Sequence, residues 1–314
     1  MGSLARTKVR RWVAGCAIAL GAAVVLIAAT QFPYSVGRPQ SAEELEKTRA
    51  YYAEAYKKAA PAEEQPTSEF ETKYIRIAAE QADGQHITEQ VARFAAAYGL
   101  RNGAVLDVGS GRGYLQDVVG NYAGLDISST VSRFYHKRFV LGSATAMPFP
   151  DNSFDGVWSI WVLEHVPNPE QALLDIRRVA KKNAVLFLYP AWDNTDWAAQ
   201  GYDVRPYSDF DLKGKLIKAS IPVRRSALFK AAARVPARAL RDVASRFGPT
   251  RLHYRLLQPN YKDYWETDSD AVNSIDRYEV MLWFRSRGDE CLNCEGVSGS
   301  LLMKSVPLIV RVHK

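Results

Sequence analysis

Cysteine is scarce in this sequence, with three residues in a chain of 314. Three cysteines cannot build the disulfide framework that stabilises small secreted domains, so that class of protein is excluded. Cys291 and Cys294 are separated by two residues, but a structural zinc site needs four ligands and the sequence offers no second pair. We therefore expect two thiols or a local disulfide at these positions, and no metal.

Long segments without charge are also scarce, because charged residues make up 24% of the chain. This share is too high for a protein with several membrane spans. The hydrophobic share of 47% is typical of globular proteins and excludes a disordered, collagen-like or coiled-coil chain. The length allows one large or two small domains, and no internal repeat divides the chain.

One segment departs from this pattern, because residues 12–30 contain no charge. About twenty apolar residues span a bilayer as a helix. Four bases lie at positions 6–11, and the next charge after the segment is Arg38. The segment is longer than the apolar part of a cleaved signal peptide, and it does not end in an Ala-x-Ala site. We therefore predict an uncleaved transmembrane anchor at 12–30, with a cleaved signal peptide or a buried N-terminus as the alternatives.

Acidic residues are nearly absent from residues 211–255, which contain twelve bases and two acids. Together with the N-terminal bases, this stretch accounts for more than the whole net charge of +7, so the rest of the chain is mildly acidic. Nucleic-acid binding is not expected, because the positive charge is confined to two patches.

Four bases of this stretch recur at helical spacing, on a different face from its apolar residues: Lys230, Arg234, Arg238 and Arg241. We predict a basic helical cap over residues 193–270 that contacts an anionic membrane surface. The alternatives are a solvated cap over a pocket and a site for an acidic substrate. Pro236 is expected to kink or divide the helix.

Short apolar segments alternate with helical patterns in the middle of the chain. Strands are expected at residues 104–108, 122–127, 139–142, 155–160 and 184–189. Helices are expected at residues 129–138, 168–181 and 276–287, and a last strand at 307–313. This alternation predicts an α/β fold, with a mostly parallel sheet and helices on both faces.

The same patterns divide the chain into five segments. They are a basic segment, anchor and linker (1–40), a helical extension (41–103), the α/β core (104–192), the basic helical cap (193–270), and the closing helix and strands (271–314).

A glycine-rich turn follows the first predicted strand and contains Gly109, Gly111 and Gly113. Glycine lets the backbone approach a ligand that a Cβ would block, and a helix that begins here would present its free N–H groups. Asp126 ends the next strand, where a carboxylate can accept hydrogen bonds from ribose hydroxyls. The dinucleotide fingerprint needs its third glycine at position 114, which is Tyr114, so a nicotinamide-dependent oxidoreductase is the weaker alternative.

Two further blocks complete the pattern, GSATAMPFPDNSFD at residues 142–155 and WVLEHV at 161–166. In order and spacing, the four blocks resemble the class I S-adenosylmethionine-dependent methyltransferases, in particular the ubiquinone and menaquinone biosynthesis subgroup. The resemblance covers about residues 104–191. It implies a Rossmann-like, doubly wound, seven-stranded sheet, S-adenosyl-L-methionine as the methyl donor, and a small-molecule or lipid-like acceptor.

The resemblance also implies a set of cofactor-binding residues. They are Asp107, Gly109, Gly111, Gly113, Asp126, Ile127, Ser143, Ala144 and Ile160. By this resemblance, Asp107 orients the methionine ammonium, Asp126 takes the ribose hydroxyls, and Ile127 lies against the adenine. Ser143 stands where the family often has Asp, which weakens the expected contact with the adenine amino group.

Transfer of a methyl group from a sulfonium needs an in-line nucleophile and the exclusion of water. A general base is needed only when the acceptor carries an acidic proton. His165 follows the fourth predicted strand and is the candidate base, with a structural role as the alternative. Because no catalytic residue is obligatory, a non-catalytic, membrane-tethered binding protein of the same fold is an alternative function.

The location of the domain depends on two opposing considerations. The bases before the apolar segment favour a cytoplasmic N-terminus, which puts the domain across the membrane. S-adenosylmethionine is made in the cytosol, however, and an active domain must reach it there. We expect cofactor supply to prevail, with a single-pass N-terminal anchor and a cytoplasm-facing domain whose basic stretch 211–255 is held at the anionic surface.

Overall fold

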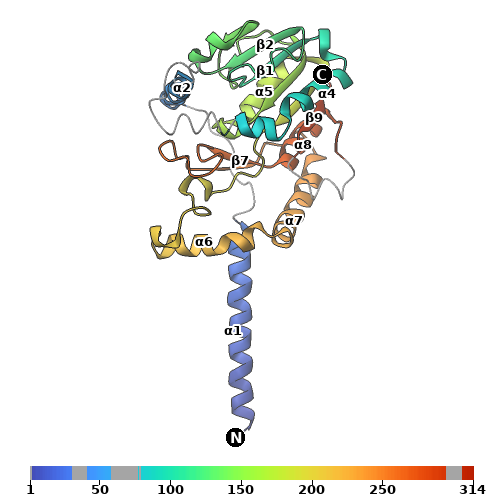
Figure 1. Ribbon diagram of the computed structural model, residues 1–314. Helices are drawn as coiled ribbons and strands as arrows, with labels where there is room; N and C mark the ends of the chain where they lie inside the picture. Colours follow the sequence, from blue (N-terminus) through green and yellow to red (C-terminus); the bar gives the residue numbers. More distant parts are fainter. Residues whose placement is uncertain (1, 30–40, 58–76, 78, 295–305) are drawn as a thin grey trace.

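The computed structural model describes residues 2–29, 41–57, 77, 79–294 and 306–314. Its centre is a seven-stranded sheet in the order β3-β2-β1-β4-β5-β9-β8 (Figure 1). The strands are β1 (Ala104–Val108), β2 (Asn121–Asp126), β3 (Arg138–Leu141), β4 (Phe154–Ile160), β5 (Ala180–Tyr189), β8 (Glu290–Cys291) and β9 (Leu308–Arg311). β1 to β5 run parallel, and β9 lies antiparallel between β5 and β8. The predicted Rossmann-like, mostly parallel sheet is confirmed.

The strand order reverses at β1, because β2 and β3 lie on one side of it and β4 and β5 on the other. Open α/β sheets bind ligands at such a point, beyond the carboxyl ends of the strands. Val105, Leu106 and Val108 of β1 are fully buried, as expected for a strand that is covered on both faces.

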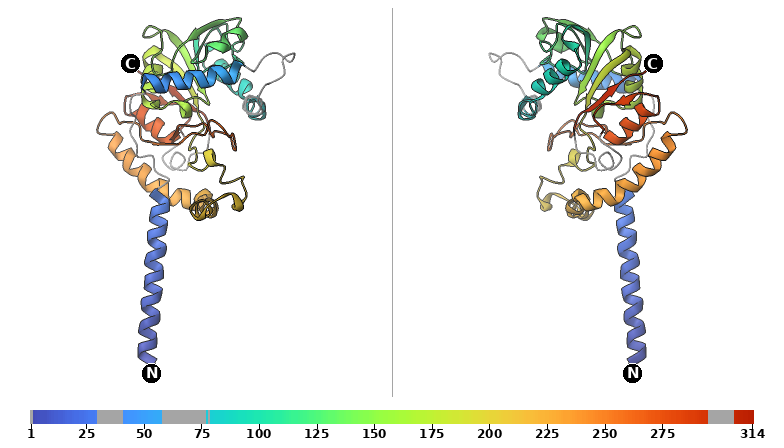
Figure 2. Two further views of the ribbon diagram at one scale, coloured as in Figure 1. Left: turned by 90° about the vertical axis from the view of Figure 1, so that its left-hand side faces the viewer. Right: turned by 90° about the vertical axis from the view of Figure 1, so that its right-hand side faces the viewer.

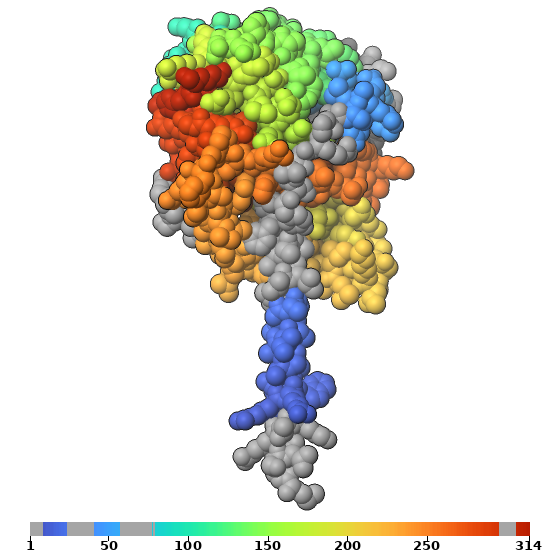
Figure 3. All heavy atoms as spheres, turned by 180° about the vertical axis from the view of Figure 1, so that it is seen from behind, coloured from blue at the N-terminus to red at the C-terminus, as the bar shows by residue number. Residues whose placement is uncertain are grey.

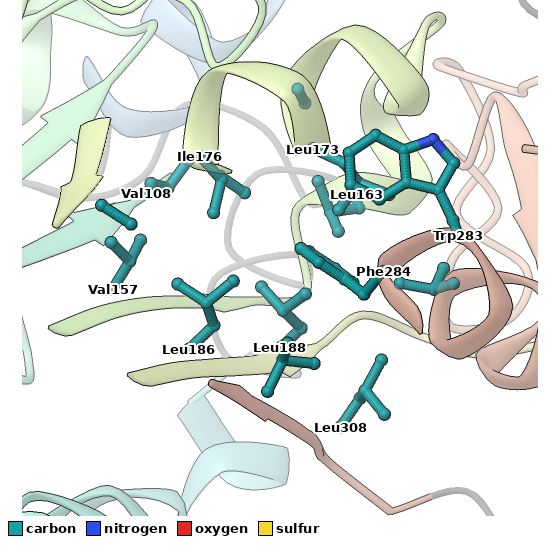
Figure 4. Packing of buried hydrophobic residues seen from close by; sticks show 14 of the residues in the cluster. Val108, Val157, Leu163, Leu173, Ile176, Leu186, Leu188, Trp283, Phe284 and Leu308 are labelled. Atoms are coloured by element: carbon teal, nitrogen blue, oxygen red, sulfur yellow. The ribbon is translucent and has the colours of Figure 1, made fainter. Parts of the chain in front are cut away.

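Helices cover both faces of the sheet. α5 (Pro169–Val179) and α8 (Arg277–Arg285) pack on one face, where Leu173, Ile176 and Phe284 are buried (Figure 4). α4 (Ile87–Ala97) packs on the other face. The side chains of Asn168 and Asp276 cap α5 and α8, as the positions of these polar residues before apolar segments predict.

The helix predicted after the glycine turn is absent, because residues 111–120 form turns and bends. Gly111 and Gly113 have φ values of +49° and +69°, which a right-handed helix cannot accommodate. Only six residues separate Gly113 from Gly120, too few for a helix of ordinary length. The glycine turn therefore does not lead into a helix whose N-terminus would point at the carboxyl end of β1.

The helix predicted at residues 129–138 is a short 3₁₀ helix, η2 (Ser129–Phe134). The hydroxyl of Thr130 donates to the carbonyl of Ala53, and that of Ser132 donates to the carbonyl of Ser129. Serine and threonine side chains that bond to backbone groups compete with regular helix formation.

The stretch of residues 193–270 contains two α-helices, α6 (Leu212–Arg225) and α7 (Ala227–Ser245). β6 (Tyr254–Leu256) follows them and pairs with β7 (Asn273–Ile275). Of the two effects expected for Pro236, a kink or a division of the helix, the division does not occur, because α7 continues through this residue. The division lies at Ser226, whose side chain accepts a hydrogen bond from the N–H of Phe229 and caps α7.

The arginines of α7 do not form an outward basic face, which corrects the prediction of a membrane contact through these residues. They pair instead with carboxylates of the body: Arg234 with Asp193, Arg238 with Asp276, and Arg241 with Glu279. The Arg238–Asp276 pair is buried and has 2.7 Å between Nη2 and Oδ2. These pairs attach α7 to the α/β core.

α1 (Gly2–Ala29) extends from the body as a single long helix and contacts α7 near its C-terminal end (Figures 1 and 2). Its side chains are described at residues 9–23, and Trp12, Ile18 and Leu20 among them are exposed. Figure 3 shows α6 (yellow) and α7 (orange) at the end of the body from which α1 leaves. Over the part of the chain that the structure describes, no helix combines the length and the hydropathy of a membrane span.

The two remaining sequence expectations concern the cysteines and the segment boundaries. Cys291 and Cys294 form a disulfide, which agrees with the alternative of a local disulfide. The five predicted segments stay a prediction, and the linker at 30–40 lies outside the described residues.

Candidate functional site

Two adjoining cavities open at the carboxyl ends of β1, β2 and β4, where the strand order reverses. Their volumes are about 100 and 170 Å³. Tyr56, Gly109, Trp161 and His165 line both cavities and therefore mark their junction. We call them the β2 cavity and the β1 cavity, after the strand whose end each one contacts most.

The β2 cavity brings together four of the predicted cofactor-binding residues: Asp126, Ile127, Ser143 and Ala144. They come from the ends of two neighbouring parallel strands, which explains why their side chains meet. Asp126 Oδ2 accepts a hydrogen bond from the N–H of Gly111 at 2.8 Å, and Oδ1 accepts one from the N–H of Ser128 at 2.8 Å. Burial raises the pKa of this carboxyl, and the two N–H groups partly oppose the shift.

Asp126 therefore ties the glycine turn to the end of β2. A carboxylate oxygen has more than one acceptor position, so these two bonds leave room for ribose hydroxyls. The structural and the ligand-binding role of Asp126 are therefore compatible.

The β1 cavity is lined by Asp107, Gly109, Gly111 and Ile160, four more of the predicted residues. Asp107 is buried, and its Oδ2 accepts a hydrogen bond from the hydroxyl of Tyr122 at 2.8 Å. Burial raises the pKa of Asp107 to about 7. A cationic group in this cavity would stabilise the ionised form, so the residue fits the predicted ammonium contact.

The three glycines have different roles. Gly109 has a φ of +73°, and a Cβ there would come within 2.2 Å of the side chain of Val162. The N–H groups of Gly109 and Ser110 both donate to the carbonyl of Leu125, which fixes the turn against β2. Gly113 lines neither cavity; it has a φ of +69° and packs against Tyr135, so it shapes the turn behind the site.

His165 lies at the junction of the cavities, in the 3₁₀ helix η3 (Leu163–His165) that follows β4. Its Nδ1 is 3.5 Å from Oδ2 of Asp270, and its Nε2 is 4.0 Å from Oε1 of Glu164. Burial lowers the pKa of His165, but the carboxylates of Asp270, Glu164 and Asp268 outweigh burial, and the pKa lies above the ordinary histidine value.

The acids around His165 are themselves perturbed. Burial raises the pKa of Glu164 to about 7 and that of Asp268 to about 6, and in both cases His165 opposes the shift. Perturbed groups of this kind are typical of functional sites. The expectation of no metal, made for Cys291 and Cys294, stays a prediction.

Two segments contribute to the site in addition to the site residues predicted from the sequence. α2 (Ala42–Lys57) covers the junction and contributes Thr48, Tyr52 and Tyr56 to the cavity walls. The loop before β7 contributes Tyr264, Thr267 and Asp268 to the β1 cavity. The hydroxyl of Tyr52 donates to Oδ2 of Asp270 at 3.3 Å, so the two segments meet beside His165.

One signal in the sequence could have indicated the loop. Glu266, Asp268 and Asp270 are three acids in five residues, directly after the most basic part of the chain. The structure adds a second signal, because Asp268 and Trp161 have φ values of +62° and +53°. Positive φ is uncommon for residues other than glycine, and it is concentrated at functional sites.

Comparison with known proteins identifies the part of the chain that forms the cavities. Residues 106–188 match the family described as methyltransferase domain. The chain is 29% identical over 179 residues to a fatty-acid O-methyltransferase of Mycolicibacterium smegmatis, a match of 51% of this chain and 65% of the relative. It is 30% identical over 139 residues to a ubiquinone/menaquinone biosynthesis C-methyltransferase of Hahella chejuensis, a match of 38% and 56%.

A third relative is a sterol 24-C-methyltransferase of Pneumocystis carinii, which is 29% identical over 133 residues, 37% of this chain and 35% of the relative. In each case, the chain spans less than two thirds of the relative's length.

Proposed function

We propose that this chain, whose residues 106–188 match a methyltransferase domain, is a class I S-adenosylmethionine-dependent methyltransferase that moves a methyl group to a small, lipid-like acceptor. The observation that carries the proposal is the junction of two cavities at His165, one of them lined by Asp126 and its neighbours and the other by Asp107. This arrangement offers one space for an adenosyl group and one for the methionine end and an acceptor.

Different residues of the chain bind different parts of the cofactor. Asp126 and Ile127 hold the ribose and the adenine in the β2 cavity, while Asp107 holds the ammonium in the β1 cavity. The sulfonium of bound S-adenosylmethionine supplies an activated methyl group. The chain supplies orientation and excludes water, which together account for most of the rate enhancement in such a transfer. α2 lies over the junction and performs this exclusion through Tyr52 and Tyr56.

His165 accepts the proton that the acceptor loses. Its Nδ1 lies toward Asp270, so Nε2 is the ring nitrogen that receives the proton. Asp270 stabilises the imidazolium that forms, and Tyr52 holds Asp270 in place through its hydroxyl. The raised pKa makes His165 a stronger base than an ordinary histidine, but it also requires a higher pH for the neutral form.

The acceptor is uncharged at the atom that meets His165. Glu164, Asp268 and Asp270 lie around the imidazole, and a further carboxylate would be repelled by them. The relatives named above include proteins whose names indicate a fatty acid, a sterol and a quinone precursor as acceptors. The charge at the junction favours a hydroxyl or an activated carbon over the carboxylate of a fatty acid.

The membrane anchor belongs to the same proposal. α1 leaves the body as an exposed helix, and residues 12–30 contain no charge. Single-pass anchoring by this helix would keep the domain at a membrane that holds lipid-like acceptors. We place the domain on the cytoplasmic face, because that face has access to the cofactor.

The experiment that tests the function uses the full chain in lipid nanodiscs, with S-adenosylmethionine that carries a deuterated methyl group. The expected result is S-adenosylhomocysteine together with a lipid from a membrane extract that gains the labelled methyl group in mass spectrometry. Cofactor binding by calorimetry without any turnover would favour the non-catalytic alternative. Protease added to sealed inside-out and right-side-out vesicles determines which face carries the domain.

A further inference from the structure

α7 directs its charged side chains toward the body and its apolar side chains outward. Its charged residues are all buried or half-buried: Lys230, Arg234, Arg238, Arg241 and Asp242. Its exposed residues are all apolar: Ala227, Leu228, Ala232, Pro236, Ala239, Leu240, Val243 and Ala244. This distribution is the reverse of that in a surface helix of a soluble domain. The outward face of α7 is therefore adapted to an apolar environment.

α6 shows a similar outward face. Its exposed residues Leu212, Leu216, Ala219 and Val223 are spaced by four, three and four positions, which aligns them in one stripe. Leu212 and Leu216 are 75% and 64% exposed, far more than an ordinary apolar side chain on a helix that packs on a core. The exposed Lys213 and Lys215 flank the stripe.

The two faces occur at one end of the molecule. α6 and the first turns of α7 lie at the end of the body from which α1 leaves, and α6 lies across the direction of α1 (Figures 1 and 2). Only one residue separates α6 from α7, so the exposed faces of the two helices adjoin. Leu228, the second residue of α7, is 83% exposed. Contiguous exposed apolar surface of this kind marks an interaction site.

We propose that α6 and the first turns of α7 form an interfacial platform, which rests on the surface of the bilayer that α1 enters. The apolar stripe with Leu216 and Leu228 enters the boundary between headgroups and acyl chains, and Lys213 and Lys215 contact anionic headgroups. The inward arginines anchor the platform to the core, so the bilayer and the cavities keep a fixed relation. The proposal uses the anchoring of α1 for its orientation and does not depend on methyl transfer.

The test measures contact with lipid directly in the full chain. Cys16 is replaced by serine, and a single cysteine is introduced at Leu216 or at Leu228 and labelled with a fluorophore. The protein is then placed in anionic nanodiscs that contain lipids with a quenching nitroxide near the headgroup. We expect strong quenching at both positions, and weaker quenching when Lys213 and Lys215 are replaced by glutamate.

Two controls keep the outcome unambiguous. A label at Leu141, which is 51% exposed on β3 in the α/β core, should not be quenched. A label at the native Cys16 in α1 reports on the anchor. If Cys16 is quenched but Leu216 and Leu228 behave like Leu141, the platform is refuted while the anchor stands. If the labels are shielded without quenching, in discs that hold two copies of the chain, the face is a dimer interface and the proposal is also refuted.

Discussion

The two cavities of the site are built from different kinds of structure. Apart from Thr48, Tyr52 and Tyr56 of α2, the β2 cavity is formed by residues at the ends of strands or just beyond them, with Asp126 as the last residue of β2 and Ser143 after β3. The β1 cavity is bounded in addition by the loop with Tyr264, Thr267 and Asp268, which approaches from a distant part of the chain and does not line the β2 cavity. The register of the sheet determines the first, while packing between segments determines the second. We therefore expect substitutions in the first to change cofactor binding and substitutions in the second to change turnover.

The largest effect is expected for His165→Ala. Loss of the base should lower turnover by about 10²-fold or more, while the affinity for S-adenosylmethionine stays unchanged. Product formation at saturating cofactor measures the first quantity, and calorimetry measures the second. If turnover and cofactor affinity both fall, His165 contributes to cofactor binding, and the expected separation of roles between the two cavities is wrong. Unchanged turnover would leave proximity as the source of catalysis.

Asp126→Ala is expected to have the opposite profile. Its carboxylate holds the N–H groups of Gly111 and Ser128, so its removal leaves polar groups without their acceptor and should weaken cofactor binding by about 1–3 kcal/mol. The measurement is calorimetry with S-adenosylhomocysteine. Asp117→Asn, an exposed substitution away from both cavities, is the matched control. Equal affinities in the two variants would exclude a role for Asp126 at the ribose.

The pH dependence of turnover should respond to Asp270→Asn. His165 must be neutral to act as a base, so turnover should rise as the pH passes upward through its raised pKa. Because the carboxylate of Asp270 contributes to that increase, its removal should move the midpoint of the profile to lower pH, together with a loss in maximal turnover. A variant that loses turnover with an unchanged midpoint would show that Asp270 acts only on packing.

The smallest effect is expected for Tyr52→Phe. The hydroxyl of Tyr52 donates one hydrogen bond to Asp270, and its loss should raise the barrier to turnover by about 0.5–1.5 kcal/mol. The ring still covers the junction in this variant, so cofactor affinity should not change. Turnover with Tyr52→Ala distinguishes the two roles of the side chain, because it removes the cover as well as the bond. If Tyr52→Phe and Tyr52→Ala lower turnover equally, the ring of Tyr52 does not contribute to turnover by covering the junction.

The cofactor side could be predicted because its residues follow from the strand pattern. Once the parallel strands are assigned, the residues after their carboxyl ends must converge, and Asp126 and Ser143 do. Asp270 could not be predicted, because it lies 105 residues after His165 and no local pattern links the two. The helix expected after the glycine turn is absent, because Gly113 has a positive φ. Glycine adopts positive and negative φ about equally readily, so its sequence position alone did not indicate this angle.

The cap shows a different limit of prediction from the sequence. Helical spacing separates the arginines of α7 from its apolar residues, but it does not indicate which face is turned inward. We expected Arg234, Arg238 and Arg241 to face outward, and the carboxylates of Asp193, Asp276 and Glu279 on the body draw them inward instead. These acids come from segments outside the helix. Their positions follow only from the tertiary structure.

The hydrogen bonds of Asp126 also have a consequence for the energetics of binding. Gly111 and Ser128 are held by this side chain before any ligand arrives, so the turn loses little conformational entropy when a cofactor binds. The glycine turn becomes ordered when β1 and β2 pair during folding. We therefore expect the affinity for the ligand and the thermal stability of the protein to change together. Saturation with S-adenosylhomocysteine at 100 times its dissociation constant should stabilise the native state by about 2.7 kcal/mol, and a substitution that loosens the β1–β2 pair should weaken affinity without touching the ligand.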